Sequence, residues 1–376
     1  MPGKDKQAVV IVGNHTQGLG IVRSAAATGY PIHVCYDRRI SASRFSKYLS
    51  HYHLLKRGTL VNIDQQRQAE YLCERLLALP VEYPSPLFTV NEDIIRFIDR
   101  YREILSQKYY IPDFSYELVF DKYEFNSFLP ENVQIPTFIV SDIDPADFGP
   151  DYILKGRQGN ILRNLTGEKA LVINSENQQH VSRAIAELPN DRLVIQKIIH
   201  TSRPIFSVCT FCAKGVIHGQ FMYEKLRQHP NQYGTGTYLK SSSSAEPLEI
   251  SKELLRRLNY TGISEIEFIF DDDTQSYRII EMNQRTWKSI IFATQCGQNF
   301  VSKYVNYIMG QPYDTNIDFA VDKYWVDLYT DIPQMIRDRK IHSYNTKELF
   351  ECTWSRKDPL PFLAIACLAP LIALKV

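Results

Sequence analysis

The sequence predicts an α/β (α+β) protein in which a parallel sheet comes first and antiparallel strands follow. Residues 8–12 form a short, continuous apolar run that ends at Gly13, which is typical of a buried parallel strand. A helical stretch over 19–28 and a second apolar run over 32–36 complete a βαβ unit. From residue 193 onwards, apolar segments separated by turn residues indicate mainly antiparallel strands.

Residues 1–110 form the predicted N-terminal α/β domain. After the βαβ unit, apolar spacing predicts a helix over 65–79, a strand over 87–90 and a helix over 92–107. Residues 111–195 differ in character, because aromatic residues and prolines interrupt short elements around Lys122 and Lys155. A helix over 178–188 and a strand over 193–197 follow, and we interpret 111–195 as a small separate subdomain.

A larger subdomain is predicted over 196–312. It begins with a hairpin, 204–212 and 216–221, that turns at Lys214 and Gly215. A polar loop over 227–244 and a helix over 253–257 come next. Two strands, 263–270 and 277–282, then flank a turn of three aspartates at 271–273.

Residues 313–376 are predicted to be a C-terminal extension. Its segment 360–374 is almost wholly apolar, but it is shorter than a membrane span and contains Pro361 and Pro370. We expect this segment to dock on the core as a helix. Peripheral contact with a membrane is the alternative that the sequence leaves open.

The composition narrows the classes of function. The chain has 43 basic and 42 acidic side chains, and this balance argues against nucleic acid as the main partner. Its seven cysteines are too sparse for a disulfide framework, and Cys209 and Cys212 would face opposite sides of one strand. Reduced thiols and the lack of an apolar signal-like run near residue 1 predict a cytoplasmic protein, whose oligomeric state stays open.

The glycine-containing turn after the first strand fits neither common nucleotide motif. Gly13, Gly18 and Gly20 are separated by five and two residues, so the dinucleotide fingerprint fails. Leu19 stands where a phosphate-binding loop needs lysine. Two interpretations remain: a turn whose backbone amides face a ligand, or a tight turn that needs glycine for its geometry.

Carboxylates and an amide converge on the last two predicted strands of the larger subdomain. If these strands pair through the aspartate turn, Glu267 lies near Glu281, and Asn283 shares a face with Glu281. Such oxygen donors suit Mg²⁺, which is held by few carboxylates and by phosphate oxygens. Arg285 lies on the same face and could hold a phosphate. The alternative is the solvated outer face of a hairpin.

Two lysines precede this cluster. Lys155 ends the apolar run 152–155 before a glycine-bearing loop, and Lys122 follows Asp121. A lysine that emerges from a strand into such a loop can serve as a point charge for phosphate. Taken singly, each would be an ordinary surface lysine.

The order of these motifs resembles the ATP-grasp superfamily over roughly residues 115–300. The final segment, in which a hydrophobic residue is followed by Glu281, Asn283 and Arg285 at alternate positions, is the most specific element. The resemblance implies an ATP-grasp fold with a preceding N-terminal domain and a lid over 111–195. It also implies Mg²⁺ ligands at Glu267, Glu281 and Asn283, with Mn²⁺ as a substitute. Phosphate contacts fall to Lys122 and Lys155, phosphoryl stabilisation to Arg285, and adenine contacts to a hinge strand formed by Gln196, Lys197, Ile198 and Ile199.

Within the superfamily, the chain looks similar to predicted carboxylate–amine ligases of the D-aspartate ligase type. Segments 43–48, 226–236 and 354–362 suggest this. The implied reaction phosphorylates a small-molecule carboxylate with ATP and passes the acyl group to an amine. Arg227, in its polar loop, is the candidate anchor for the acid, and a solvent-exposed arginine is its alternative. A non-amine acceptor, or nucleotide binding without catalysis, also remains open.

Overall fold

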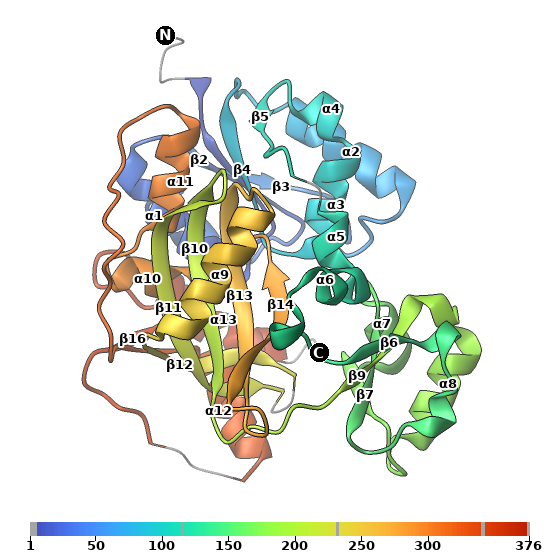
Figure 1. Ribbon diagram of the computed structural model, residues 1–376. Helices are drawn as coiled ribbons and strands as arrows, with labels where there is room; N and C mark the ends of the chain where they lie inside the picture. The colour runs from blue at the N-terminus through green and yellow to red at the C-terminus, as the bar shows by residue number, and fades with distance from the viewer. Residues whose placement is uncertain (1–5, 115, 231–232, 340–342, 374–376) are drawn as a thin grey trace.

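The computed structural model describes residues 6–114, 116–230, 233–339 and 343–373, which form three sheets (Figure 1). The first has five strands in the order β3-β2-β1-β4-β5. The second has four strands, β6-β9-β7-β8, and stands apart at the lower right of Figure 1. The third has seven strands, β14-β13-β10-β11-β12-β15-β16, and forms the centre of the molecule.

The first sheet is parallel throughout, as the βαβ pattern predicted. All four side chains of its central strand are buried, which explains the unbroken apolar run. Its elements are β1 (Val9–Val12), α1 (His15–Ala25), β2 (Ile32–Tyr36), β3 (His51–Leu54), α2 (Gln66–Leu77), β4 (Ser85–Thr89), α3 (Glu92–Arg100), α4 (Arg102–Leu105) and β5 (Tyr109–Tyr110).

Helix α1 begins at His15, four residues before the predicted start, so Gly18 and Gly20 lie inside the helix and not in a loop. Gly20 is required by packing: a Cβ there would lie 2.9 Å from Cγ2 of Ile290 on α10 (Ile290–Gln295). Gly13 has φ +96°, a conformation that favours glycine. Backbone geometry and close packing therefore account for these two glycines without a ligand.

The four-stranded sheet is antiparallel. The predicted boundary between residues 195 and 196 falls inside β9, because Gln196 and Lys197 both pair with neighbouring strands of this sheet. Its strands are β6 (Thr137–Ile139), β7 (Tyr152–Gly156), β8 (Ala170–Val172) and β9 (Leu193–Lys197). Its helices are α7 (Ile161–Thr166) and α8 (Gln178–Glu187), and α5 (Glu117–Phe120) and α6 (Lys122–Phe128) lead into it.

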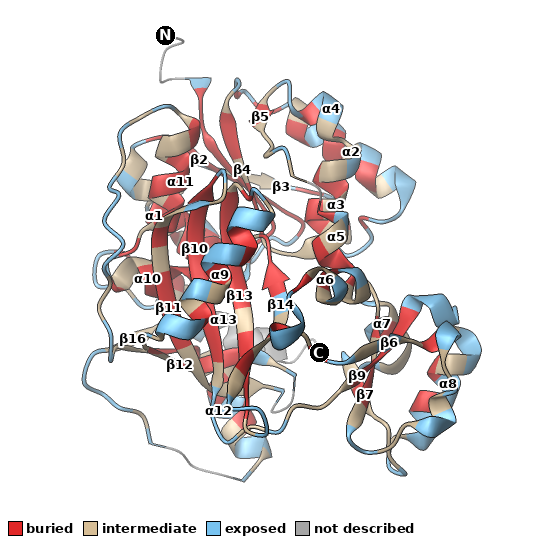
Figure 2. Ribbon diagram, viewed as in Figure 1, coloured by how far each residue is buried: buried red, intermediate tan, exposed pale blue. Residues whose placement is uncertain are grey.

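The seven-stranded sheet is antiparallel except for its last pair, and both of its faces are covered (Figure 2). Helix α9 (Ala245–Arg257) packs on one face, and α10 with α11 (Phe300–Ile308) packs on the face toward the N-terminal sheet. Cys209 and Cys212 belong to the hydrophobic clusters on opposite faces, as predicted. The strands are β10 (Ile205–Ala213), β11 (Val216–His229), β12 (Thr235–Ser241), β13 (Gly262–Asp271), β14 (Ser276–Asn283), β15 (Tyr324–Val326) and β16 (Leu349–Glu351).

One sequence prediction about this sheet is wrong. The predicted polar loop over 227–244 is largely strand, because β11 continues to His229 and pairs with β12. Its small residues suit the tight packing there: a Cβ on Gly236 would lie 2.6 Å from Leu239. The predicted C-terminal extension is also part of the sheet, since it supplies β15 and β16.

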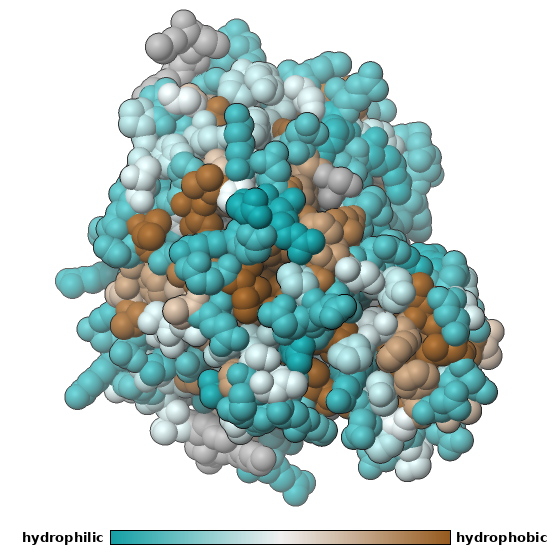
Figure 3. Space-filling model, viewed as in Figure 1, coloured by the Kyte–Doolittle hydropathy of each residue, from teal (hydrophilic) through white to brown (hydrophobic). Residues whose placement is uncertain are grey.

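The rest of the C-terminal region contains α12 (Leu328–Arg337) and α13 (Leu360–Ala373). The first part of α13 packs near residues 42–45, and Tyr329 Oη donates to the carbonyl of Phe362 at 3.3 Å. Leu360 and Leu363 are exposed, and residue 374 of the apolar run lies outside the described residues. Within the described part of the chain, no helix is long and apolar enough to cross a membrane. Hydrophilic residues cover most of the face drawn in Figure 3.

Candidate active site

The acidic cluster lies on the paired strands β13 and β14. In this pair Glu267 lies opposite Glu281, and Glu265 lies opposite Asn283, because the register shifts by one residue between Glu267 and Phe268. The pairing places three carboxylates and an amide on the face that also bears α10 and α11. The register of one hairpin thus brings together residues up to 18 positions apart.

Each member of the cluster has a protein partner. Lys225 Nζ lies 2.5 Å from Glu267 Oε1, and both side chains are largely buried. Asn283 Nδ2 donates to Glu281 Oε1 at 3.1 Å, and Arg285 Nη2 donates to Asn283 Oδ1 at 3.0 Å. Among the described residues, no three acidic, imidazole or thiol side chains form a group that could hold a metal ion by themselves.

The charges of this cluster depend on one another. Burial favours neutral Glu281, but the positive charges of Lys225, Lys169 and Lys122 outweigh it, and the pKa of Glu281 lies below its usual range. Burial likewise opposes the charge on Lys225, but Glu267 and Glu265 raise its pKa. Glu281 nevertheless remains exposed to solvent, so a ligand can reach it.

Lys225 was not identified from the sequence. It lies on β11, two strands from Glu267, and only the order β13-β10-β11 brings the two together. The one available signal was that Lys225 and Tyr223 alternate on one face of a strand that was predicted to end at Phe221. An extended strand would have placed both side chains toward the acidic cluster.

The two predicted phosphate lysines lie within electrostatic range of Glu281. Lys155, on β7, donates to Gln196 Oε1 at 2.7 Å. Burial and, next, the charge of Lys122 lower the pKa of Lys155 to about 8, whereas Glu281 and Glu267 act in the opposite direction. Lys122 begins α6, and Asp121 caps that helix while pairing with Arg157 at 2.7 Å. The lysines and the carboxylates therefore share one electrostatic environment.

The backbone of the predicted hinge strand is partly available for a ligand. The N–H of Lys197 donates to Pro136 at 2.9 Å, and the N–H of Ile198 donates to Asp151 at 2.7 Å. In the described chain, the N–H of Ile199 makes no such bond. The N–H of Ile199 is therefore a backbone donor that a ligand could use.

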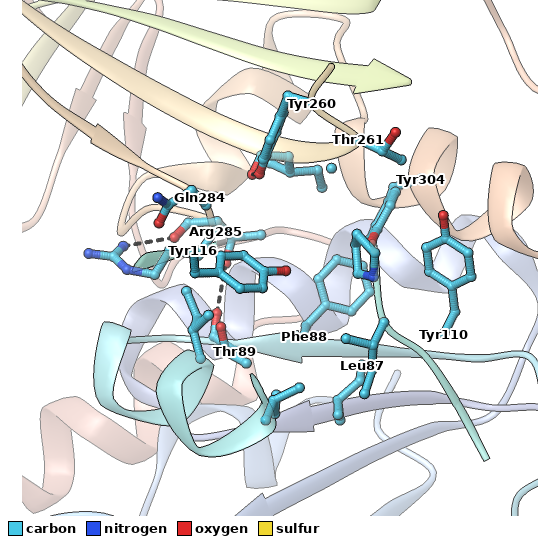
Figure 4. Close-up of a pocket in the computed structure, with 17 residues that line it drawn as sticks. Leu87, Phe88, Thr89, Tyr110, Tyr116, Tyr260, Thr261, Gln284, Arg285 and Tyr304 are labelled. Atoms are coloured by element: carbon cyan, nitrogen blue, oxygen red, sulfur yellow. Dashed lines mark hydrogen bonds between the residues drawn. The ribbon is translucent and has the colours of Figure 1, made fainter. Parts of the chain in front are cut away.

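Arg285 connects the acidic cluster to a cavity of about 60 Å³ (Figure 4). Its Nη1 donates to the carbonyl of Thr286 at 2.9 Å, and its Nε is buried without a partner among the described atoms. Figure 4 shows the guanidinium extending away from the tyrosines that line the cavity, Tyr110, Tyr116 and Tyr304 among them. None of the candidate metal ligands lines the cavity. The cavity is therefore separate from the acidic cluster and lies between the N-terminal and the seven-stranded sheets.

The first turn of helix α1 reaches the same region through Gln17. Its Nε2 donates to the carbonyl oxygen of Thr286 at 2.7 Å and to Thr286 Oγ1 at 2.8 Å. Helix α1 is therefore bonded to the segment that follows the acidic strand, next to Arg285 in the sequence.

Arg227 lies on β11 and not in a loop. Its Nη2 is 2.6 Å from Asp331 Oδ2, and Asp331 also accepts bonds from Thr237 and Tyr344. The guanidinium lies over the rings of Tyr238 and Tyr344, at 4.2 and 4.9 Å from their centroids. A buried partner and two rings hold this arginine, which argues for a structural role over the predicted contact with the acid.

We expect Arg227→Leu to lower the free energy of unfolding by roughly 3–5 kcal/mol, because it leaves the Asp331 carboxylate buried and unpaired. Urea unfolding of Arg227→Leu, Asp331→Leu and the double variant measures this effect. The double variant should recover much of the loss, since it removes both charges. Normal stability of Arg227→Leu, combined with a selective defect for the acid substrate, would instead restore Arg227 as the anchor.

The three sheets define the ATP-grasp fold, which confirms the fold prediction. Residues 237–311, which include Glu267, Glu281 and Asn283, match the family described as carbamoyl-phosphate synthase L chain, ATP binding domain. The matched residues include β13 and β14, which bear the acidic cluster, but they do not include the N-terminal sheet.

Solved structures extend the similarity to most of the chain. N5-carboxyaminoimidazole synthetase from Staphylococcus aureus has 15% identity and a TM-score of 0.64, with 89% of this chain and 87% of that chain covered. L-amino acid ligase from Bacillus licheniformis has 13% identity and a TM-score of 0.60, with 84% and 78% covered. The biotin carboxylase domain of Hydrogenobacter thermophilus 2-oxoglutarate carboxylase has 14% identity and a TM-score of 0.61, with 85% and 74% covered. No curated protein sequence matches the chain.

Proposed function

We propose that the chain is an Mg-ATP-dependent carboxylate–amine ligase. The observation that supports this most directly is the pairing of Glu267 with Glu281 beside Asn283, within electrostatic range of Lys155. Two carboxylates and an amide oxygen suit Mg²⁺, which keeps waters and shares phosphate oxygens and so does not need three protein carboxylates. When bound, Mg²⁺ would neutralise charge on the phosphates of ATP.

The side chains divide the work of phosphoryl transfer between them. Lys122 and Lys155 hold the phosphates as point charges, and Ile199 offers its N–H to the adenine. Arg285 stabilises the phosphoryl group as it moves from ATP to the oxygen of the substrate carboxylate. The product of this step is an acyl phosphate; an amine then attacks its carbonyl carbon and releases phosphate. Phosphoryl transfer needs positioning and charge more than covalent help from the protein.

A non-amine fate of the acyl group is the second candidate. The similar structures include carboxylase-type enzymes, and one of them contains ADP, magnesium and bicarbonate. Bicarbonate is therefore one acid to test beside amino acids. The same residues would promote phosphorylation of an amino acid or of bicarbonate. The proposed roles of the phosphate-binding residues therefore do not depend on which acid is the substrate.

Hydroxylamine trapping tests the proposal. With ATP, Mg²⁺ and the correct acid, we expect a hydroxamate together with ADP and phosphate, because an acyl phosphate reacts with hydroxylamine without the natural amine. A screen of amino acids and related acids measures hydroxamate by colour and nucleotide by chromatography. Formation of AMP and pyrophosphate would indicate an acyl adenylate and would contradict the proposed chemistry.

A further inference from the structure

Glu265 is a buried carboxylate that the proposed reaction does not use. Only 4% of its surface is exposed, and it lies on the same face as Glu267, two residues nearer the start of β13. Burial and, next, the charge of Glu267 raise its pKa to about 7. Keeping such a group in a protein interior is costly unless its oxygens are hydrogen-bonded.

Both oxygens of Glu265 accept hydrogen bonds. The buried hydroxyl of Tyr223 donates to Oε1, and Nδ2 of Asn283 donates to Oε2 at 3.2 Å. Tyr223 comes from β11 and Asn283 from β14, so Glu265 connects two strands that flank β13 and β10. One of these two hydrogen bonds therefore comes from the side chain of Asn283, a candidate metal ligand.

Three contacts agree on the orientation of the Asn283 amide. Its Nδ2 faces Glu265 and Glu281, and its Oδ1 accepts from Arg285 Nη2 at 3.0 Å. Rotating the amide by 180° would turn its oxygen toward two carboxylates and its NH₂ toward a guanidinium. Both changes are unfavourable, because each would place like partners together.

This orientation matters because an amide binds a hard cation only through its oxygen. When Glu281 binds a metal, its lone pairs are shared with that ion, and its hold on Asn283 Nδ2 weakens. Glu265 then remains as the acceptor that keeps the amide from rotating. Tyr223 in turn fixes the position of Glu265.

We propose that Glu265, held by Tyr223, is a positioning residue that orients the Asn283 amide oxygen for the metal. This inference rests on the proposed function, because it assumes that Glu281 and Asn283 are metal ligands. The role of Glu265 is to accept a hydrogen bond and not to contact the ion or the substrate.

Binding of Mn²⁺ to the purified protein, followed by the loss of its free-ion electron paramagnetic resonance signal, tests the inference without measuring turnover. Glu265→Met removes the acceptor at similar volume, and we expect Mn²⁺ affinity to fall about 10- to 100-fold. Glu265→Gln keeps one acceptor for Asn283 and a donor toward Tyr223, so we expect affinity within about threefold of the unsubstituted protein. Metal-free ADP binding should be equal in all three proteins.

Asn283→Asp provides the matched control. A carboxylate has two equivalent oxygens, so it needs no orientation, and Glu265→Met should then leave Mn²⁺ affinity unchanged in this background. Equal losses in both backgrounds would show general damage to the site and would overturn the inference. If Glu265→Met does not fold, Tyr223→Phe makes the same comparison, with a smaller expected loss.

The outcomes separate this inference from the proposed function. If the unsubstituted protein binds Mn²⁺ and Glu265→Met binds it equally well, the positioning role is wrong and the metal site stands. If the unsubstituted protein does not bind Mn²⁺, with or without ADP, the metal site fails and the positioning role fails with it.

Discussion

Glu281→Gln is expected to lower ATP-dependent phosphate release by about a thousandfold, because a metal that neutralises transition-state charge contributes several kcal/mol. The side chain of Glu281 is exposed to solvent, and glutamine has nearly the same size and shape, so the substitution leaves no cavity. Unfolding by urea should therefore change little. The rate is measured as phosphate released with ATP, Mg²⁺ and the acid identified by the hydroxylamine screen.

Glu224→Gln is the matched control for this prediction. Glu224 is also a strand glutamate, though partly buried, and it lies beside Lys225 on the other face of β11, where Ser242 Oγ donates to it at 3.1 Å. We expect its rate to remain near that of the unsubstituted protein. A Glu281→Gln protein with near-normal turnover would remove Glu281 from the metal site.

The sequence predicted the local parts of this site because local rules determine them. The aspartate turn sets the register of β13 against β14 as far as Phe268 and Ile279, whereas a one-residue shift between Glu267 and Phe268, which local rules do not predict, brings Glu281 opposite Glu267. The parallel N-terminal sheet was also predictable, since buried parallel strands produce unbroken apolar runs such as residues 9–12.

Contacts between distant strands could not be predicted in the same way. The pair formed by Arg227 and Asp331 joins residues 104 positions apart, and Lys225 meets Glu267 only because β10 lies between their strands. Small and polar residues made β12 look like a loop, although its side chains are mostly buried in the finished sheet. In each case tertiary packing overrides local preference.

Lys155→Met is expected to lower turnover by about 10²–10³-fold, because it removes one charged donor aimed at the phosphates. The same change should stabilise the fold at pH 7. Burial lowers the pKa of Lys155 from 10.5 to about 8, so keeping the ammonium charged in the folded protein opposes folding. We expect a gain of about 1–2 kcal/mol, after allowing for partial solvent access and for the lost bond to Gln196.

The stabilising effect of Lys155→Met is expected to depend on pH. Between pH 8 and 10.5 the unfolded chain binds a proton at Lys155 that the folded chain does not, so the stability of the unsubstituted protein rises with pH across this window. The stabilising effect of Lys155→Met should thus be full below pH 8 and disappear toward pH 10.5. Urea unfolding across this range measures it, with exposed Lys252→Met as the control.

Catalysis should show the opposite dependence on pH. Only the charged ammonium attracts phosphate, so kcat/KM for ATP should fall as the pH rises through about 8, the pKa of Lys155 in the free enzyme. Lys155→Arg keeps its charge throughout this range and should shift the fall to higher pH. If Lys155→Met instead destabilises the fold and leaves kcat/KM unchanged, the lysine is a structural group. A lysine that binds phosphate is expected to be needed for turnover and also to destabilise the fold. The reason is that function requires its charged form, whereas burial disfavours that form.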